Sequence, residues 1–356
     1  MSVRKEAVVF VPGLAVQDRD FFLDCISTGL TEHLEITNVK EVGEAKIAGN
    51  SGKRFELYID AENIKIIDIY EAYWADLFSK LSEQDLKSQF LNGTYLLFYW
   101  LFGKIWASVR EAPTLFIGIM TSLLLLFFWY YGILAMALTA IGQDPNFLNF
   151  IPIKTEWAKS IGSVGTTMGG WSVWLIVSGL LNLIPVKLGV DIADFTRRYL
   201  DEDMEGSAIK AKIRQRVSVI LNDVLNEKIY ERVTILAHSF GVVVATDMLA
   251  DYYYPKQIKI RYISLGGPLK VLSYKSGWVE KEIKKCLNNN IIDNWIDFYS
   301  DQDWMCTKTP IPKGCNPEKI QYQKNNLKFS LFKQLSGKSH THYFTDEKVL
   351  KTILDI

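Results

Sequence analysis

Residues 234–249 read TILAHSFGVVVATDML, and this stretch decides the fold. An apolar run leads into AHSFG (237–241), and a second apolar run follows it. The first run predicts a short buried strand and the second a buried helix. A serine between them predicts a strained strand-to-helix turn, which requires small residues two positions before and after the serine. Ala237 and Gly241 meet that requirement around Ser239.

Candidate strands and helices alternate on both sides of this turn. Buried strands are predicted at 6–14, 63–70, 232–237, 258–269 and 294–300, and a half-exposed strand at 52–60. Helices are predicted at 19–34, at 209–224 and at the end of the chain, where Thr345 is the expected N-cap. This mixture of strands and helices predicts an α/β fold.

Two uncharged stretches interrupt the pattern. Residues 112–143 contain no charged side chain over 32 positions, and they are strongly apolar. A bilayer crossing needs about 20 apolar residues, so a transmembrane helix is expected at about 113–142. A second uncharged stretch at 160–186 predicts a second span, within which Gly165 and Gly169 have the GxxxG spacing that permits close helix approach. Two spans form a hairpin with both flanks on one side of the membrane.

An aromatic-rich stretch at 90–106, interrupted by Lys104, precedes the first span. Because it is short for a span, it is expected to lie in the membrane interface, with a buried helix of the soluble part as the alternative. The chain is thus expected to consist of the N-terminal part of one domain (1–88), a membrane insertion (89–190) and the C-terminal part of the same domain (191–356).

Basic residues near the two spans predict their orientation. Those flanking the hairpin are Lys104, Arg110, Lys187, Arg197 and Arg198, and those in the connecting loop are Lys154 and Lys159. Since basic residues concentrate on the cytoplasmic side, the protein is expected to be an integral membrane protein whose Ser239-bearing domain is cytoplasmic. The N-terminus, MSVRKEAVVFVPGL, reads as a strand and not as a secretory signal, which agrees with this orientation.

The composition argues against several other classes of protein. The 40 basic and 40 acidic residues balance within 356, so no global charge indicates nucleic acid as a partner. Four scattered cysteines without a CxxC pair indicate neither a disulfide framework nor a zinc ribbon. No P-loop or glycine-rich dinucleotide motif follows a predicted strand, so nucleotide chemistry is not expected. The oligomeric state is left open.

The strand, the AHSFG turn and the helix after it together resemble the α/β-hydrolase superfamily. Within that superfamily the chain looks most like the lipase-like group that includes the GPI inositol-deacylases, with Ala237 in place of the commoner first glycine. The resemblance implies an α/β-hydrolase fold, with a mostly parallel sheet and flanking helices, interrupted by the two-helix transmembrane insertion. It also implies that Ser239 is the nucleophile of a catalytic triad whose members follow in the order serine, acid, histidine.

The resemblance also implies which histidine is the base. Two of the four histidines follow the serine, namely His340 and His342. The lipase-like relatives carry a histidine three residues before an aromatic pair, and the pair Tyr343-Phe344 gives His340 that spacing. His340 is therefore expected to take the proton from Ser239, and His342 is the alternative.

The acid is expected in WIDFYSDQDWM (295–305), at the end of a later strand. Asp297 lies inside that strand and is misplaced for the role. Relatives that the chain resembles show Asp-Pro-Val after a similar strand end, and Asp303 occupies that position, although Trp304 replaces the proline. Asp303 is therefore the expected acid, and Asp301 is the alternative.

Backbone N–H groups are expected to stabilise the oxyanion that forms during acyl transfer. One donor is Phe240, which directly follows the serine, and the other belongs to the loop after an early strand. FVPGL (10–14) matches that loop, so Leu14 is the expected second donor, with a plain Pro-Gly turn as the alternative.

Together these features predict a membrane-anchored serine hydrolase that cleaves ester bonds of lipids or other acylated amphiphiles. The lipid bilayer and an acyl-ester substrate are the expected partners, and neither a metal ion nor an organic cofactor is expected. The alternatives are a thioesterase or protein deacylase, and a catalytically silent membrane interaction or effector protein on a hydrolase fold.

Overall fold

The computed structural model describes residues 2–14, 18–34, 38–60, 62–78, 80–107, 113–149, 151–170, 186–201, 204–254, 259–303, 306, 308–326, 329–330, 334 and 338–356. The chain divides into two compact units, which are described separately. The sheet unit comprises Met1–Leu77, Ala107–Phe116 and Glu202–Ile356. The helical unit comprises Phe78–Trp106 and Ile117–Asp201, and it is therefore inserted within the sequence of the sheet unit.

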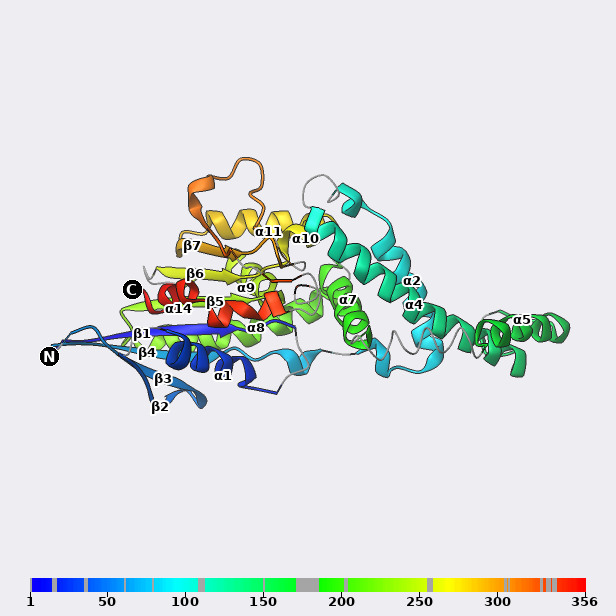
Figure 1. Cartoon of the computed structure of the whole chain (residues 1–356), viewed down its shortest axis with the longest axis horizontal. Helices are drawn as coiled ribbons and strands as arrows, with labels where there is room; N and C mark the ends of the chain where they lie inside the picture. Colours follow the sequence, from blue (N-terminus) through cyan, green and yellow to red (C-terminus); the bar gives the residue numbers. More distant parts are fainter. Residues whose placement is uncertain are drawn as a thin grey trace. The chain divides into compact units, whose positions relative to one another are not determined.

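An eight-stranded sheet forms the centre of the sheet unit (Figure 1). Its strands are β1 (Ser2–Val11), β2 (Val39–Ile47), β3 (Asn50–Tyr58), β4 (Asn63–Glu71), β5 (Arg232–His238), β6 (Ile260–Leu265), β7 (Ile292–Tyr299) and β8 (Ile320–Lys324). Their order across the sheet is β2-β3-β4-β1-β5-β6-β7-β8. The pairs from β4 through β8 are parallel, and β2, β3 and β4 pair antiparallel. The predicted α/β class is confirmed, with a mostly parallel sheet.

The parallel strands end at one edge of the sheet, and this alignment positions the turns that follow them. Val11, the last residue of β1, pairs with Ala237 of β5, while His238 pairs with Leu265, the last residue of β6. Leu265 is in register with Phe298 of β7. The segments after β1, β5, β6 and β7 therefore emerge side by side, although they are far apart in the sequence.

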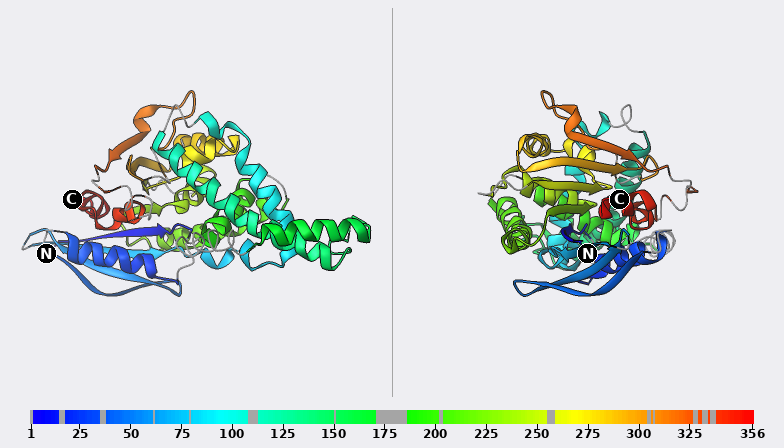
Figure 2. Two further views of the ribbon diagram at one scale, coloured as in Figure 1. Left: turned by 45° about the vertical axis from the view of Figure 1, so that its right-hand side comes forward. Right: turned by 90° about the vertical axis from the view of Figure 1, so that its left-hand side faces the viewer.

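Helices cover both faces of the sheet, as the right-hand view of Figure 2 shows. They include α1 (Phe21–Thr28), α8 (Met204–Glu227), α9 (Phe240–Ala250), α10 (Leu269–Ser273), α11 (Gly277–Asn288), α13 (Lys338–Thr341) and α14 (Glu347–Leu354). On one face, Phe22 of α1 and Leu350 of α14 share a core with Phe10 and Leu236. On the other face lie α8, α9 and α11, of which α9 is buried along its whole length. A strand buried on both faces is apolar throughout, and this explains the continuous run in β5.

The sequence pattern predicts neither β2 nor β8. These strands lie at the two edges of the sheet and lack an apolar pattern, since β2 is largely exposed and only Ile320 of β8 is buried. The predicted N-cap of the C-terminal helix, Thr345, is wrong. Asp346 caps α14 by accepting a hydrogen bond from Val349 N at 3.0 Å, whereas the Thr345 hydroxyl contacts His342 Nδ1 at 2.9 Å.

The helical unit consists mainly of α2 (Leu86–Leu101), α4 (Pro113–Gln143), α5 (Thr155–Met168) and α7 (Val186–Leu200). Among the described residues, the part of α4 from Ile119 to Gln143 is the one helix long and apolar enough to cross a membrane. The expected limits of the insertion, residues 89 and 190, fall inside α2 and α7, whereas the boundaries of the helical unit lie outside both helices.

α4 and α5 pack through glycines. A Cβ on Gly142 of α4 would lie 2.5 Å from the Cα of Gly162 on α5, and one on Gly165 would lie 2.5 Å from the Thr139 backbone N. Gly169 follows the last residue of α5 and donates its N–H to the Gly165 carbonyl. α5 therefore ends inside the predicted second span (160–186), whose residues 171–185 lie outside the described residues.

The stretch predicted as interfacial, 90–106, begins within α2. One side of α2 packs on α4, where a Cβ on Gly93 would meet the Trp129 ring at 2.8 Å and the Thr94 and Tyr130 hydroxyls lie 2.6 Å apart. Another side bears four exposed side chains at spacings of three and four residues. These are Leu91, Tyr95, Phe98 and Phe102. An exposed apolar stripe on the helix that packs against α4 is compatible with an interfacial position.

Candidate active site

Ser239 occupies the turn between β5 and α9 in a strained backbone conformation. Its φ is 56° and its ψ is −128°, a region that residues other than glycine rarely adopt. Two backbone hydrogen bonds hold the turn, from Ser239 N to the Leu265 carbonyl at 2.9 Å and from Val242 N to the Ser239 carbonyl at 3.0 Å. The neighbouring strand thus fixes the half-buried serine at the start of a helix.

Close backbone approach explains the small residues around the serine. A Cβ on Gly241 would lie 2.2 Å from the Val11 carbonyl oxygen and 2.5 Å from that of Pro12. A Cβ on Gly13 would lie 2.7 Å from Ser239 Cβ and 3.2 Å from its Oγ. The loop after β1 therefore lies directly against the serine, and glycine is required on both sides of the contact.

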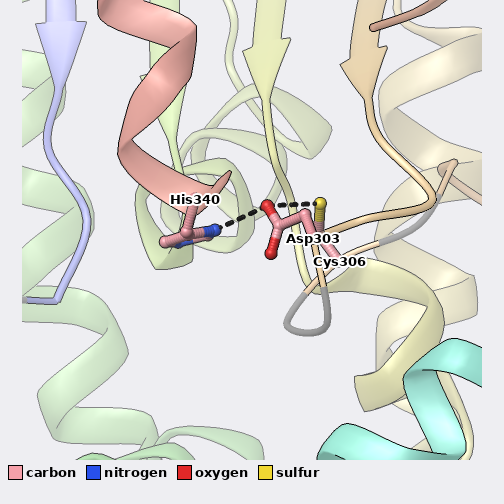
Figure 3. A group of neighbouring side chains, drawn as sticks. All are labelled: Asp303, Cys306 and His340. Carbon is pink, nitrogen blue, oxygen red and sulfur yellow. Dashed lines mark hydrogen bonds and ion pairs between the residues drawn. The ribbon is translucent and has the colours of Figure 1, made fainter. Parts of the chain in front are cut away.

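Asp303 and His340 form a buried pair (Figure 3). His340 Nδ1 lies 2.7 Å from Asp303 Oδ2, and the two residues are 9% and 1% exposed. Asp303 belongs to the turn that leaves β7, where its N–H bonds to the Ser300 carbonyl at 3.1 Å. His340 belongs to α13, which precedes the C-terminal helix. The nitrogen that faces the carboxylate carries the proton, because a carboxylate oxygen only accepts.

The pair lies beside the Ser239 turn. His238 Nε2 donates a hydrogen bond to the His340 carbonyl oxygen at 2.8 Å, and the two imidazole rings lie 4.9 Å apart. Ser239 N bonds to the carbonyl of Leu265, and the next residue, Gly266, lies close to Asp303. A Cβ on Gly266 would be 3.2 Å from Asp303 Oδ2. The Asp303–His340 pair therefore contacts the residues on either side of the Ser239 turn, at the carboxyl edge of the sheet.

His238 is a neutral structural residue. Burial, followed by the neighbouring His340, lowers the pKa of His238 to about 3. Its Nε2 faces a carbonyl oxygen and must carry the proton, whereas its Nδ1 is buried and has no hydrogen-bond partner in the described part of the chain. The ring packs against Phe22 and Phe344, so it supports the turn and the α13 backbone.

His340 Nε2 is the atom of this group that can accept a proton. Nδ1 carries the ring's proton toward Asp303, so Nε2 of the neutral ring has a free lone pair. This atom is buried and has no hydrogen-bond partner among the residues that the structure describes, Ser239 included. In enzymes without substrate, the hydrogen bond between nucleophile and base is often long and tightens only when substrate binds.

The alternative residues lie outside this group. Asp301 is exposed and forms an ion pair with Lys324. His342 turns toward Thr345, with 2.9 Å between its Nδ1 and the hydroxyl oxygen. Asp297, which the sequence places within a strand, is buried in β7 and accepts a hydrogen bond from the Ser264 hydroxyl at 2.6 Å. The structure therefore brings together the preferred residues and leaves the alternatives apart.

The expected oxyanion donors flank the serine. Phe240 begins α9, where the N–H groups of the first turn point away from the helix. Leu14 follows Gly13, where an added Cβ would lie 2.7 Å from Ser239 Cβ. Trp74 steadies this loop, because its indole N–H donates to the Pro12 carbonyl at 3.0 Å and its ring lies 6.0 Å from that of Phe240.

Cys306 and Tyr343 also form hydrogen bonds to the Asp303 carboxylate. No sequence pattern predicts this role for either residue. Cys306 Sγ lies 2.9 Å from Asp303 Oδ2, and the Tyr343 hydroxyl donates to the same oxygen at 3.3 Å. Burial, and then the charge of Asp303, raise the pKa of Cys306 well above its usual value, so the sulfur is a thiol and donates. Tyr343 belongs to the aromatic pair used to choose the histidine, whereas Cys306 is a lone cysteine without a motif.

A cavity of about 950 Å³ lies elsewhere in the sheet unit. It is lined by residues at the amino ends of β5 and β6, including Arg232, Lys259 and Arg261. Within it, Arg261 forms an ion pair with Asp355 at 2.6 Å. Because Ser239 follows the opposite end of β5, this cavity is not part of the candidate active site.

The carboxyl edge of the sheet carries a serine on a strained turn, an imidazole oriented by a carboxylate and the buried carboxylate itself, and these are the three kinds of group that nucleophilic acyl transfer uses. Comparisons of the chain with protein-family models, with curated proteins and with solved structures find no match.

Proposed function

We propose that the protein is a membrane-anchored serine hydrolase that cleaves ester bonds of lipids or other acylated amphiphiles. One observation carries the proposal. His340 Nδ1 is hydrogen-bonded to Asp303, and His340 Nε2 has no hydrogen-bond partner among the described residues. The ring lies beside the strained Ser239 turn. The proposed architecture is an α/β-hydrolase fold interrupted by a two-helix transmembrane insertion.

The proposed reaction begins when Ser239 Oγ attacks the ester carbonyl and its proton passes to His340 Nε2. Asp303 stabilises the imidazolium, and the backbone N–H groups of Phe240 and Leu14 bind the oxyanion. The imidazolium then donates its proton to the leaving alcohol, and an acyl-enzyme remains. Water, deprotonated by His340, hydrolyses that intermediate and restores the serine.

The substrate class is argued from the helical unit. α4 combines the length and hydropathy of a membrane span with exposed apolar side chains such as Leu124, Phe127 and Met136. A surface of this kind is unfavourable in water and favourable in hydrocarbon. The proposal therefore places this unit in the bilayer, with a second span over 160–186 and the sheet unit at the cytoplasmic face. An active site held at a membrane meets lipids and acylated amphiphiles first.

The test is labelling of purified membranes with a fluorophosphonate probe, which reacts with activated serines. Labelling is expected for the unchanged protein and is expected to be lost in Ser239→Ala and His340→Ala. His342→Ala is the matched control and should keep the label, because its ring lies outside the Asp303 group. A folded, unchanged protein that does not react would contradict the proposal and favour a silent hydrolase fold.

A positive result leads to a substrate panel of glycerolipids, acyl thioesters and acylated peptides, offered in detergent micelles to the same variants. Turnover of a lipid ester that is at least tenfold faster than turnover of the thioester and the peptide supports the proposed class. The reverse order of rates would assign the site to a thioesterase or protein deacylase.

A further inference from the structure

The side chains that meet at the Asp303 carboxylate also form a cluster of atoms that can bind a metal ion. Asp303 Oδ2, Cys306 Sγ and His340 Nδ1 all lie within 4.8 Å of one another, and all three residues are buried. Figure 3 shows the thiol and the imidazole reaching the carboxylate from opposite sides. No other group of three such side chains occurs in the part of the chain that the structure describes.

We propose that Asp303, Cys306 and His340 bind Zn²⁺ and that this ion reversibly inhibits the hydrolase. One nitrogen, one sulfur and one oxygen ligand form a donor set that zinc accepts, whereas Mg²⁺ and Ca²⁺ prefer oxygen ligands alone. The thiolate and the carboxylate together carry two negative charges, which neutralise the ion. A neutral complex suits a buried site, because an uncompensated charge there is costly.

The distances require a small rearrangement. His340 Nδ1 and Cys306 Sγ lie 2.7 and 2.9 Å from Asp303 Oδ2, which are hydrogen-bond distances. Ligands of a tetrahedral zinc ion at about 2.0–2.3 Å from the metal lie roughly 3.4–3.6 Å apart. These two pairs must therefore each separate by about 0.7 Å, and the third pair, His340 Nδ1 and Cys306 Sγ, which lie within 4.8 Å of each other, must reach the same range. Such changes are within the reach of side-chain rotation.

The Tyr343 hydroxyl can serve as a fourth ligand. The Tyr343 hydroxyl lies 3.4 Å from Cys306 Sγ and 3.3 Å from Asp303 Oδ2, so it faces the same space as the three donors. Either this phenol or a water molecule completes four-coordination. The three side-chain donors are sufficient for the proposal, since zinc sites with three protein ligands and one water are common.

Zinc would change the protonation of the base. The ion replaces the Cys306 proton, which is released to solvent, and it occupies the lone pair that His340 Nδ1 gains when the ring proton moves to Nε2. One proton is therefore released for each ion bound, and the imidazole stays neutral. Nε2 then carries a proton and no longer accepts one from Ser239. The inhibition rests on the proposed function, whereas the binding of the ion does not.

Binding is tested with Co²⁺, which replaces Zn²⁺ and gives a sulfur-to-metal charge-transfer band. Purified full-length protein in detergent is titrated with Co²⁺ and then with Zn²⁺. The unchanged protein and Cys315→Ala are expected to show the band, because Cys315 lies outside the cluster. Cys306→Ala and the isosteric Cys306→Ser are expected to lack it. A band that persists in both Cys306 variants would overturn the assignment of the site.

Inhibition is tested by the rate of fluorophosphonate labelling. Zn²⁺ is expected to slow labelling of the unchanged protein, EDTA to restore it, and Mg²⁺ to have no effect. In Cys306→Ser the half-inhibiting Zn²⁺ concentration, measured against that variant's own untreated rate, is expected to rise at least tenfold. An equal concentration in both proteins would overturn the proposal.

The two proposals fail in different ways. Labelling without any cobalt band and without zinc inhibition refutes the metal site and leaves the hydrolase intact. A cobalt band that depends on Cys306, in a protein that never labels, supports the metal site and refutes the hydrolase.

Discussion

Gly13→Ala tests whether the loop after β1 supports the Ser239 turn. The added Cβ would lie 2.7 Å from Ser239 Cβ and 3.1 Å from the His238 carbonyl oxygen, whereas ordinary contact begins at 3.4 Å. The loop or the serine must therefore move by about 0.7 Å, the difference between 3.4 and 2.7 Å. Neither moves easily, because hydrogen bonds to Leu265 and Trp74 hold the two segments.

Two effects are expected from this displacement. Overpacking of a tight contact costs about 1–3 kcal/mol of the free energy of unfolding. A reacting group misplaced by about 1 Å loses roughly 10²-fold in rate, so a shift of 0.7 Å is expected to slow labelling by about 10- to 100-fold. The assays are the urea-unfolding midpoint of the purified protein and the rate constant of fluorophosphonate labelling.

Gly277→Ala is the matched control. Gly277 is the first residue of α11, and a Cβ there meets no atom within 4 Å. Alanine in a helix is favoured over glycine by up to about 1 kcal/mol, so this variant should be as stable as the unchanged protein or slightly more stable. If Gly13→Ala matched this control in both assays, the loop would not lie against Ser239 and the reasoning would be refuted.

Three further predictions follow from the other contacts. Asp303→Asn is expected to slow labelling by roughly 10³- to 10⁴-fold because the imidazole loses its orienting carboxylate. The control Asp301→Asn should change the labelling rate by no more than about twofold, because Asp301 is exposed and its surface ion pair contributes little. Equal losses in the two variants would contradict the assignment of Asp303. Burial raises the pKa of Glu71 to about 7 from 4.5, so its contribution to stability is full below pH 4.5 and is lost as pH rises through 7. Glu71→Gln should therefore match the unchanged protein near pH 4.5 and exceed its unfolding free energy by about 3 kcal/mol at pH 8, and a difference independent of pH would count against it. Gly142→Ala should force α4 and α5 apart, because its Cβ would lie 2.5 Å from the Gly162 Cα, and should lower the melting temperature of the protein in detergent. Gly189→Ala, whose added Cβ meets no atom within 4 Å, should not lower it. Equal melting temperatures would disprove the glycine contact.

The strands near the serine could be predicted because local patterns dominate there. β5 is buried on both faces, so its apolar run and the small residues after it are visible without any tertiary information. The edge strands could not be predicted in this way, because one paired neighbour and a solvated face leave little apolar signal. The C-terminal cap failed for another reason: Thr345 and Asp346 are both good N-caps, and only the backbone decides which of them precedes the helix.

The site itself could be predicted only in part. Asp303 and His340 are 37 residues apart, and only the resemblance to known relatives selected them from three aspartates and two histidines. Cys306 escaped prediction because it reaches the carboxylate through a turn whose geometry no local pattern reveals. The contacts of Cys306 and Tyr343 with the buried Asp303 carboxylate become visible only in the three-dimensional structure.

The order of the strands has a consequence for the synthesis of the protein. β4 ends at Glu71 and β1 lies between it and β5, so β1, β2, β3 and β4 can pair from the first part of the chain alone. β5 begins only at Arg232, after the whole helical unit has left the ribosome. The contact between Gly13 and Ser239 closes at that late moment, because distant pairing must wait for both partners. A nascent chain that stalls before β5 is made therefore carries β1 to β4 but no assembled serine turn.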